Sequence, residues 1–275
     1  MKQRNLKKYR KITVGALLLL LCILFAVLGP VLAPWSPTEM HVEIRNQGMS
    51  FAHPFGTDKF GRDLFVRVWC GVRISLGVGL ASALLNGGLG VLCGAVAGYE
   101  GKSMDQILMR FADIVASIPS LLYVILLMMV LGPNEVSILA GLCVSGWIDT
   151  ARLVRGEVMR TKSKEFVLAS KLAGAGAIRI FLMHLLPNAF GPIVVSLTLL
   201  VPQAIFTEAF LSFMGVGIPA PRASLGTMIQ TARSQIFVYP YQMLIPTAVL
   251  CILILSLHLI GAGAEDIIRN RREGM

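Results

Sequence analysis

Residues 165–188, EFVLASKLAGAGAIRIFLMHLLPN, form the segment around which the rest of this chain is organised. It carries charge between long apolar segments, and it is interrupted first by Gly174, Ala175 and Gly176 and again at Pro187. The interruptions predict two short helices, the first of which ends at the glycines. Apolar residues at i, i+3, i+4 and i+7 predict that the second helix is amphipathic and lies on a membrane surface or a neighbouring helix. These residues are Ile178, Phe181, Leu182 and Leu185.

The chain as a whole is too apolar for a soluble protein of 275 residues, since hydrophobic residues make up 55% of it and charged residues only 15%. A helix rises about 1.5 Å per residue, so a run of about 18 or more apolar residues can cross a hydrocarbon core about 30 Å thick. Each span must satisfy its own backbone hydrogen bonds, which favours helices. We therefore predict an all-α membrane protein with six transmembrane helices, at about 12–33, 74–98, 114–132, 136–155, 189–214 and 241–264.

The distribution of positive charge predicts the orientation of these spans. With six spans, both termini lie on one side of the membrane, together with 99–113 and 152–188. That side would hold 18 of the 25 Lys and Arg residues. The positive-inside rule then places both termini and the loop 156–188 in the cytoplasm. Nucleic-acid binding is not expected despite the net charge of +10, because no compact basic and aromatic face is visible.

The predicted division of the chain follows from these spans. A cytoplasmic tail, 1–11, precedes the first span, which we interpret as uncleaved because its apolar run is too long for a typical signal peptide. An external segment, 34–73, leads to a five-helix core, 74–264, and a cytoplasmic tail, 265–275, ends the chain.

Two helices are predicted outside the membrane. Apolar residues from Phe60 to Trp69 recur at helical spacing and predict an interfacial helix, with Lys59/Asp63 and Asp63/Arg67 as i, i+4 charge pairs. The second external helix is predicted over 224–236, where Ser224 can act as N-cap.

Polar residues inside the predicted spans are functional candidates, because charge in hydrocarbon is costly. Glu208 shares the fifth span with Gln203, and it either lines a transport path or forms a hydrogen bond to a neighbouring helix. Asp149 is predicted to pair with Arg152 at i, i+3 rather than to line a cavity. His258 is predicted to be a packing residue rather than a proton relay.

No motif for catalysis or metal binding emerges. The five cysteines form no CxxC pair and the four histidines no HExxH, so neither a zinc site nor a disulfide framework is predicted. Gly101, Lys102 and Ser103 resemble the end of a P-loop, but the glycine required five positions earlier is Val96. The chain is predicted not to be an enzyme, which leaves a transporter or a membrane assembly factor.

Resemblance to a known family narrows this choice. Residues 165–170, Gly174 and the Leu-Pro-Asn at 186–188 resemble the EAA loop of bacterial ABC importer permeases. Ser170 stands where that loop usually has alanine, and Ala173 where leucine is common.

A second motif resembles the HPxGTDxxGRDxxSR signature of the dipeptide, oligopeptide and nickel permease group. Here it reads HPFGTDKFGRDLFVR from His53, with Val66 in place of the usual serine. The segment EAFLSFMGVG at 208–217 is also similar to that group. The residues of the external family motif are Gly56, Thr57, Asp58, Gly61, Arg62, Asp63 and Arg67.

The resemblance implies a type I ABC importer permease of the C type, in the bacterial inner membrane. Its implied partners are a homologous permease, two cytoplasmic ATPase subunits that bind ATP and Mg, and an extracytoplasmic solute-binding protein. No cofactor is implied for this chain. Pro187 and Asn188 are implied to shape the loop, and its first helix to contact an ATPase subunit. The implied contact residues are Glu165, Phe166, Val167, Leu168, Ala169, Ser170 and Gly174.

The function expected from the resemblance is inward transport of di- or oligopeptides, driven by ATP hydrolysis in the partners. Import of nickel or a nickel chelate is the alternative within the family. A proton-coupled secondary transporter, with Glu208 or His258 as the coupling group, is the alternative from another class.

Overall fold

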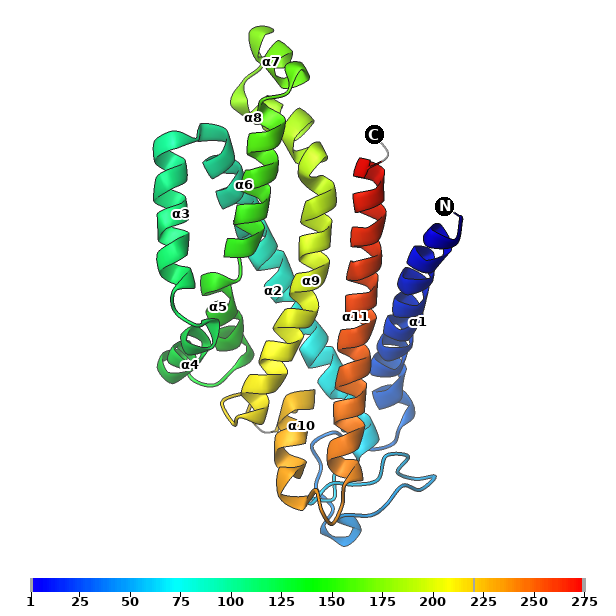
Figure 1. The fold of residues 1–275 in the computed structure, drawn as a ribbon. Helices are drawn as coiled ribbons and strands as arrows, with labels where there is room; N and C mark the ends of the chain where they lie inside the picture. Colours follow the sequence, from blue (N-terminus) through cyan, green and yellow to red (C-terminus); the bar gives the residue numbers. More distant parts are fainter. Residues whose placement is uncertain (1, 220, 274–275) are drawn as a thin grey trace.

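The computed structural model describes residues 2–219 and 221–273, and these residues are almost wholly helical (Figure 1). Short 3₁₀ turns occur at Val42–Ile44 and Arg233–Gln235, and one π-helical turn at Phe181–Leu185. The α-helices are α1 Lys2–Leu32, α2 Leu64–Glu100, α3 Lys102–Ala116, α4 Ser120–Leu131, α5 Glu135–Ser145, α6 Ile148–Lys162, α7 Glu165–Leu172, α8 Ala177–Ile180, α9 Leu186–Phe213, α10 Leu225–Ala232 and α11 Tyr241–Glu273.

Five helical segments of the described chain are long and apolar enough to cross a membrane, or up to six if a bent pair counts as one span. The five are Tyr9–Leu32, Leu64–Glu100, Glu135–Lys162, Ala177–Phe213 and Tyr241–Arg269. This confirms the all-α membrane fold, with the predicted six spans reached when the bent pair is counted as one. The bent pair is α3 and α4, which meet at an angle of 77°.

The bent pair differs from the straight third span predicted at 114–132. The helix begins earlier, at Lys102, and ends at Ala116 before a short linker. Pro119 follows in this linker with an extended backbone, ψ 131°. The residue before a proline is disfavoured in the helical conformation, which explains the break.

Helix α2 is the central element of the bundle, since it packs against α1, α6 and α9. Helix α11 packs between α1 and α9. In Figure 1, α7 projects beyond the other helices at one end of the molecule, and α10 lies at the other end with the loops that follow α1. The first turn of α1 and the last turn of α11 point toward the α7 end.

Helices α2 and α6 approach closely because α2 presents glycines to α6. A Cβ built on Gly94 would overlap the Ala151 carbonyl oxygen and lie 2.9 Å from the Val154 Cβ. Gly90 and Gly98, one turn away on either side, meet α6 in the same way. The glycine-rich second span therefore serves close helix packing, as its composition predicts.

Gly94→Val is expected to destabilise the bundle by about 1–3 kcal/mol or more, because the added side chain overpacks this interface. The check is the thermal unfolding midpoint of the purified chain in detergent. Gly88→Val is the matched control on the same helix, where a new Cβ meets no atom within 4 Å. Equal midpoints for the two variants would show that the interface tolerates separation.

The predicted interfacial helix does not exist as a separate element. Helix α2 begins at Leu64, and the Asp63 carboxylate caps it by accepting a hydrogen bond from the Val66 N–H at 2.8 Å. The prediction over 60–69 was wrong because the turn at Gly61, φ 75°, leaves Phe60 in the preceding loop. The predicted charge pairs of Asp63 were wrong too, since its carboxylate binds the His53 ring at 2.8 Å.

The chain also continues through Pro187, where a second break was predicted. Helix α8, the π-helical turn and α9 form one segment, Ala177–Phe213. Pro187 has no N–H to donate, and it directly follows the π-helical turn, a local adjustment that lets a helix continue through a proline. The π-helical turn before it adds a residue and rotates the faces of the helix. Leu185 is consequently fully buried while Ile178 is 78% exposed, so the predicted stripe does not share one face.

Helix α10 agrees with the prediction at 224–236. The Ser224 hydroxyl caps it by accepting from the Thr227 N–H at 3.3 Å. Its buried face packs on α9 and α11. That face consists of Leu225, Met228, Ile229 and Ala232.

Candidate functional site

Helix α7, which carries most of the EAA-like residues, is anchored to its own chain through Val167. This side chain is only 3% exposed and joins a cluster with Val154 and Val158 of α6 and Ile180 of α8. Val167 therefore holds α7 in place and offers no surface to a partner, unlike its implied contact role.

Polar contacts also hold α7 against the segment that follows it. The His184 Nε2 lies 3.2 Å from the Ser170 hydroxyl, and the His184 ring is 5.8 Å from the ring of Phe166. Asn188 in turn donates from Nδ2 to the His184 carbonyl at 2.7 Å. Sequence reasoning missed His184, although it lies one helical turn before Asn188.

Gly174 ends α7 in a left-handed conformation, φ 82°. Its N–H donates to the Lys171 carbonyl at 3.0 Å, and the Ala175 N–H donates to the Ser170 carbonyl at 3.1 Å. Glycine is favoured at such a helix end because a side chain is strained there. At the other end, Glu165 lies in the first turn, where a carboxylate suits the helix dipole.

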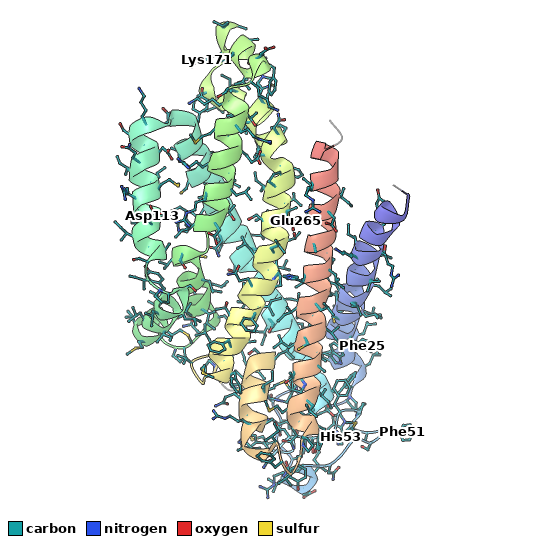
Figure 2. All side chains as sticks on the ribbon, in the orientation of Figure 1. Phe25, Phe51, His53, Asp113, Lys171 and Glu265 are labelled. Carbon is teal, nitrogen blue, oxygen red and sulfur yellow. The ribbon has the colours of Figure 1, made fainter. Side chains whose placement is uncertain are left out.

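The outer side of α7 and the segment after it are apolar and exposed. Leu172 is 90% exposed and Ile178 is 78% exposed, at the end of the molecule where Figure 2 labels Lys171. Exposed apolar patches of this kind mark surfaces that contact another protein or a membrane. We call this patch the coupling surface, and it consists of Phe166, Leu168, Leu172, Ile178, Leu182 and Met183.

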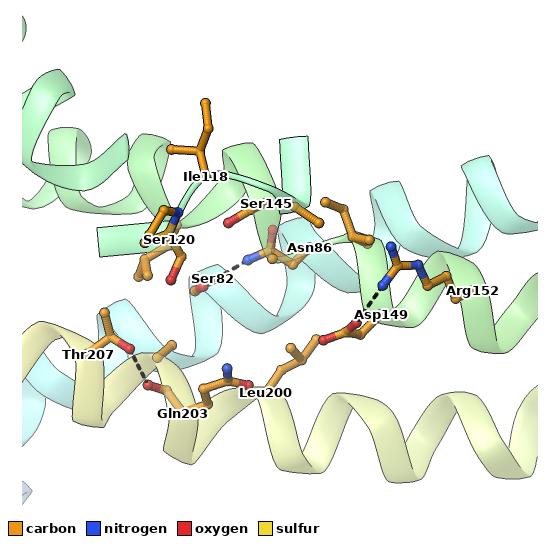
Figure 3. Close-up of a pocket in the computed structure, with 16 residues that line it drawn as sticks. Ser82, Asn86, Ile118, Ser120, Ser145, Asp149, Arg152, Leu200, Gln203 and Thr207 are labelled. Atoms are coloured by element: carbon orange, nitrogen blue, oxygen red, sulfur yellow. Dashed lines mark hydrogen bonds and ion pairs between the residues drawn. The ribbon is translucent and has the colours of Figure 1, made fainter. Parts of the chain in front are cut away.

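A polar cavity of about 250 Å³ lies where two of the spans are interrupted (Figure 3). One wall comes from the linker between α3 and α4, another from the break between α5 and α6, and the rest from α2, α6 and α9. Its polar lining includes Ser82, Asn86, Ser120, Ser145, Asp149, Arg152, Gln203 and Thr207.

Asn86 is the most enclosed of these polar side chains, at 2% exposure. Its Nδ2 donates to the Ser82 hydroxyl at 3.0 Å, and its Oδ1 is buried with no partner among the described residues. Gly146 makes room for it, since a Cβ there would lie 2.7 Å from the Asn86 amide. The wall of the cavity therefore contains a buried amide whose oxygen lacks the hydrogen-bond partner that such groups normally have.

Asp149 and Arg152 form the charged part of the lining. Arg152 lies 3.8 Å from Asp149, as predicted, but it makes a shorter contact, 2.8 Å, with Asp113 of α3. The Asp149 side chain is 90% exposed and reaches the cavity as well. Asp149 therefore both pairs with Arg152 and lines the cavity, although the sequence favoured the pairing alone.

Gln203 and Glu208 occupy different surroundings although both lie on α9. Gln203 lines the cavity. Glu208 is fully buried and accepts hydrogen bonds from the Ser75 hydroxyl of α2 at 2.9 Å and the Ser212 hydroxyl at 2.8 Å. Glu208 therefore joins α9 to α2, which is the helix-packing alternative.

His258 is exposed on α11, and the prediction that it packs inside the bundle was wrong. Leu253 and Ser256 are fully buried and so mark the face of α11 that packs in the bundle. His258 lies on a different face of the helix.

The external family motif builds a platform beneath α2. The Thr57 hydroxyl accepts from the Gln47 N–H at 2.9 Å, and its carbonyl accepts from the Gln242 amide of α11 at 3.1 Å. Asp58 accepts from the Arg62 Nε at 2.7 Å, while Gly56, like Gly61, adopts a positive φ of 75°. The motif thus ties the start of α2 to the preceding loop and to the start of α11.

Metal and nucleotide sites gain no support from the described residues. Among them, no group of three or more His, Cys, Asp or Glu side chains could hold a metal ion. Gly101 ends α2, and the turn it starts leads directly into α3, with no strand before it.

Comparison with known proteins shows where this fold and these motifs belong. Residues 90–272 match the family model "Binding-protein-dependent transport system inner membrane component", and residues 4–48 match "N-terminal TM domain of oligopeptide transport permease C". The chain is 43% identical over 253 residues to the oligopeptide transport system permease protein OppC of Bacillus subtilis, covering 92% of this chain and 83% of the relative. It is also 43% identical over 264 residues to the dipeptide transport system permease protein DppC of that organism, covering 96% and 82%.

Solved structures show the same fold at low sequence identity. A chain of the MetNI methionine ABC transporter, in inward-facing conformations, matches 74% of this chain and 95% of its own, with a TM-score of 0.59 and 19% identity. A chain of an amino acid ABC transporter with histidines matches 71% and 91%, with a TM-score of 0.55 and 14% identity. This chain therefore belongs to the family of binding-protein-dependent transport system inner membrane components, the membrane permease subunits of ABC importers.

Proposed function

We propose that this chain is the permease subunit of an importer for di- or oligopeptides, and that it forms the transport path together with a homologous permease. The relatives named above are oligopeptide and dipeptide permeases. The observation that carries the proposal is α7, a short helix that is anchored from within by Val167 and exposes apolar side chains outward. Such a helix can transmit force from a partner to the spans.

The partner on the coupling surface is an ATPase subunit, which binds the ATP and Mg. Movement of α7 reaches α6 through Val167 and the fifth span through the contact of Ser170 with His184. Both of these spans line the polar cavity. Closure of the ATPases can therefore change the width of the cavity, which is the requirement for alternating access.

The cavity is the part of the path that this chain provides. Asn86 contributes an amide to the wall, and rotation of this amide would turn its unpartnered oxygen toward the N–H groups of a peptide. Asp149 suits an amino terminus, and Gln203 can either donate or accept. The homologous permease supplies the facing wall.

The orientation follows from the charge distribution. The α7 end and both chain termini face the cytoplasm, where the ATPase subunits are. The platform of the external motif and α10 face outward, toward the solute-binding protein.

The test is ATP-driven uptake of labelled trialanine by the complete importer in proteoliposomes, with ATP supplied on the side of the ATPase subunits. Uptake is expected to require ATP hydrolysis and to survive collapse of the proton gradient. Uptake that persists without hydrolysis but collapses with the gradient would indicate a secondary transporter. Uptake of nickel in the absence of peptide uptake would indicate the metal-importing branch of the family.

Glu208→Gln is expected to leave ATP-driven uptake within about twofold of the wild type, because the amide oxygen can accept from one of the Ser75 and Ser212 hydroxyls while the amide NH₂ donates to the other. Glu208→Leu is expected to lower the yield of folded protein, since both hydroxyls lose their buried acceptor. Uptake is measured in the proteoliposomes described above. Loss of uptake by a fully folded Glu208→Gln protein would instead assign the carboxylate a role in proton transfer.

A further inference from the structure

A second cavity, of about 740 Å³, lies at the end of the molecule opposite α7. It is bounded by the platform of the external motif, the loop after α9, and α10. Among the described residues that line it there is no carboxylate, whereas five are cationic. They are Lys59, Arg62, Arg67, Arg222 and Arg233.

The acidic residues behind this cavity do not balance its positive charge. Asp58 is the counter-charge of two guanidinium groups, since its carboxylate lies 2.7 Å from Arg62 and 3.8 Å from the Arg67 Nε. Glu135 pairs with Arg222 at 2.8 Å.

Two of the five cations have aromatic rather than acidic neighbours. Lys59 lies 5.2 Å from the ring centre of Phe60, and Arg233 lies 5.9 Å from that of Phe213. The cavity therefore keeps a positive excess.

Arg67 is buried and incompletely paired. The residue is 4% exposed, and its Nη1 donates to the Pro37 carbonyl at 2.6 Å. Its Nε has no hydrogen-bond partner among the described residues. A small void of about 10 Å³ beside Asp58 and Arg67 has room for no more than one water molecule. The nearest carboxylate to Arg67 is that of Asp58, which also binds Arg62, so the positive charge of Arg67 is only partly balanced.

We propose that this cavity binds the carboxylate of the transported peptide at the entrance of the path, an inference that rests on the function proposed above. A carboxylate is the anion whose two oxygens match a guanidinium, and a cavity lined by one sign of charge concentrates such ligands. The volume suits a small ligand rather than a single protruding side chain. Helix α10 adds neutral groups that can bind the peptide main chain, namely Thr227, Gln230 and Thr231.

The test compares trialanine with trialanine amide, which lacks the carboxylate. Binding of each is measured on the complete membrane complex in nanodiscs, without the solute-binding protein. Wild type is expected to bind trialanine about tenfold more tightly than the amide, as loss of a charge-assisted pair implies. Arg67→Gln and Arg233→Gln are expected to remove this preference. Arg45→Gln is the matched control, since Arg45 is exposed in the same external segment and does not line the cavity.

Three outcomes would overturn the proposal. The first is equal binding of acid and amide by the wild type, and the second is a preference that both variants retain. The third is that the variants weaken docking of the peptide-free solute-binding protein while trialanine does not bind, which would assign the cavity to an acidic side chain of that protein. If Arg67→Gln fails to assemble, the test rests on Arg233→Gln. Arg233 is exposed, so its replacement is expected to leave the fold intact.

Wild-type uptake separates this inference from the function on which it rests. If ATP-driven uptake of trialanine is normal but the complex binds trialanine and its amide equally, the proposed role of the cavity is refuted and the proposed function is not. Absence of any peptide uptake by the wild-type importer refutes the proposed function.

Discussion

Leu172→Glu is expected to lower ATP-driven uptake by about ten- to a hundredfold, through loss of the ATPase subunits from the complex. Leu172 is 90% exposed, so the new carboxylate costs the isolated chain almost nothing. In an apolar interface the same carboxylate must be desolvated without a partner, which costs several kcal/mol. The measurements are co-purification of the ATPase subunits and uptake in proteoliposomes.

Leu172→Met is the matched control, because methionine keeps the volume and the apolar character and is expected to preserve both readouts. Phe237→Glu adds a charge at another fully exposed apolar residue, close to α10 at the opposite end, and should leave the ATPase subunits bound. If Leu172→Glu co-purifies with the ATPase subunits and transports normally, the coupling surface is not the contact.

Apart from the bent third span, the spans and the break at Gly174 could be predicted from the sequence, because hydropathy and helix-ending chemistry are local properties. Phe60 shows where periodicity alone misleads, since it fits the helical spacing of Leu64 and Phe65 but precedes the cap. A capping signal was present, as Asp63 lies three residues before the Val66 N–H that it accepts from. Weighing this signal would have joined the predicted interfacial helix to the second span.

Pro187 illustrates a feature that local reasoning cannot supply. A proline in an amphipathic pattern usually ends a helix, yet here a π-helical turn precedes it and the helix continues. The turn lies where Ile180 and Leu185 pack against Val154 and Val158 of α6. That packing depends on residues more than 20 positions away, so the sequence pattern near Pro187 does not reveal it.

The polar cavity depends on tertiary structure in the same way. Asn86 and Gln203 are distant in sequence and meet only because α2 and α9 pack together. An asparagine within an apolar run was nevertheless a usable signal, because a polar group inside a span is costly unless it has a function or a partner. Val167 shows the opposite case, since its place in the EAA-like motif implied a contact that its burial excludes.

Asp58→Ala is expected to destabilise the platform by about 3–5 kcal/mol, because it leaves buried guanidinium groups without their counter-charge. Asp58 is 5% exposed, as is Arg62, and Arg67 is 4% exposed. The carboxylate also accepts from the N–H groups of Phe60 and Arg62, at 2.8 and 3.0 Å, so its loss opens the turn that leads into α2. The measurement is the thermal unfolding midpoint of the purified chain in detergent.

Two further variants separate loss of charge balance from loss of a side chain. Glu43→Ala removes an exposed carboxylate from the same external segment and is expected to leave the midpoint unchanged. The double variant Asp58→Ala with Arg62→Leu is expected to be more stable than Asp58→Ala alone, because one of the two unpaired charges is gone. If the double variant is instead less stable, unpaired buried charge is not what destabilises Asp58→Ala. Since α7 lies at the other end of the molecule, ATPase subunits should still bind every variant that remains folded.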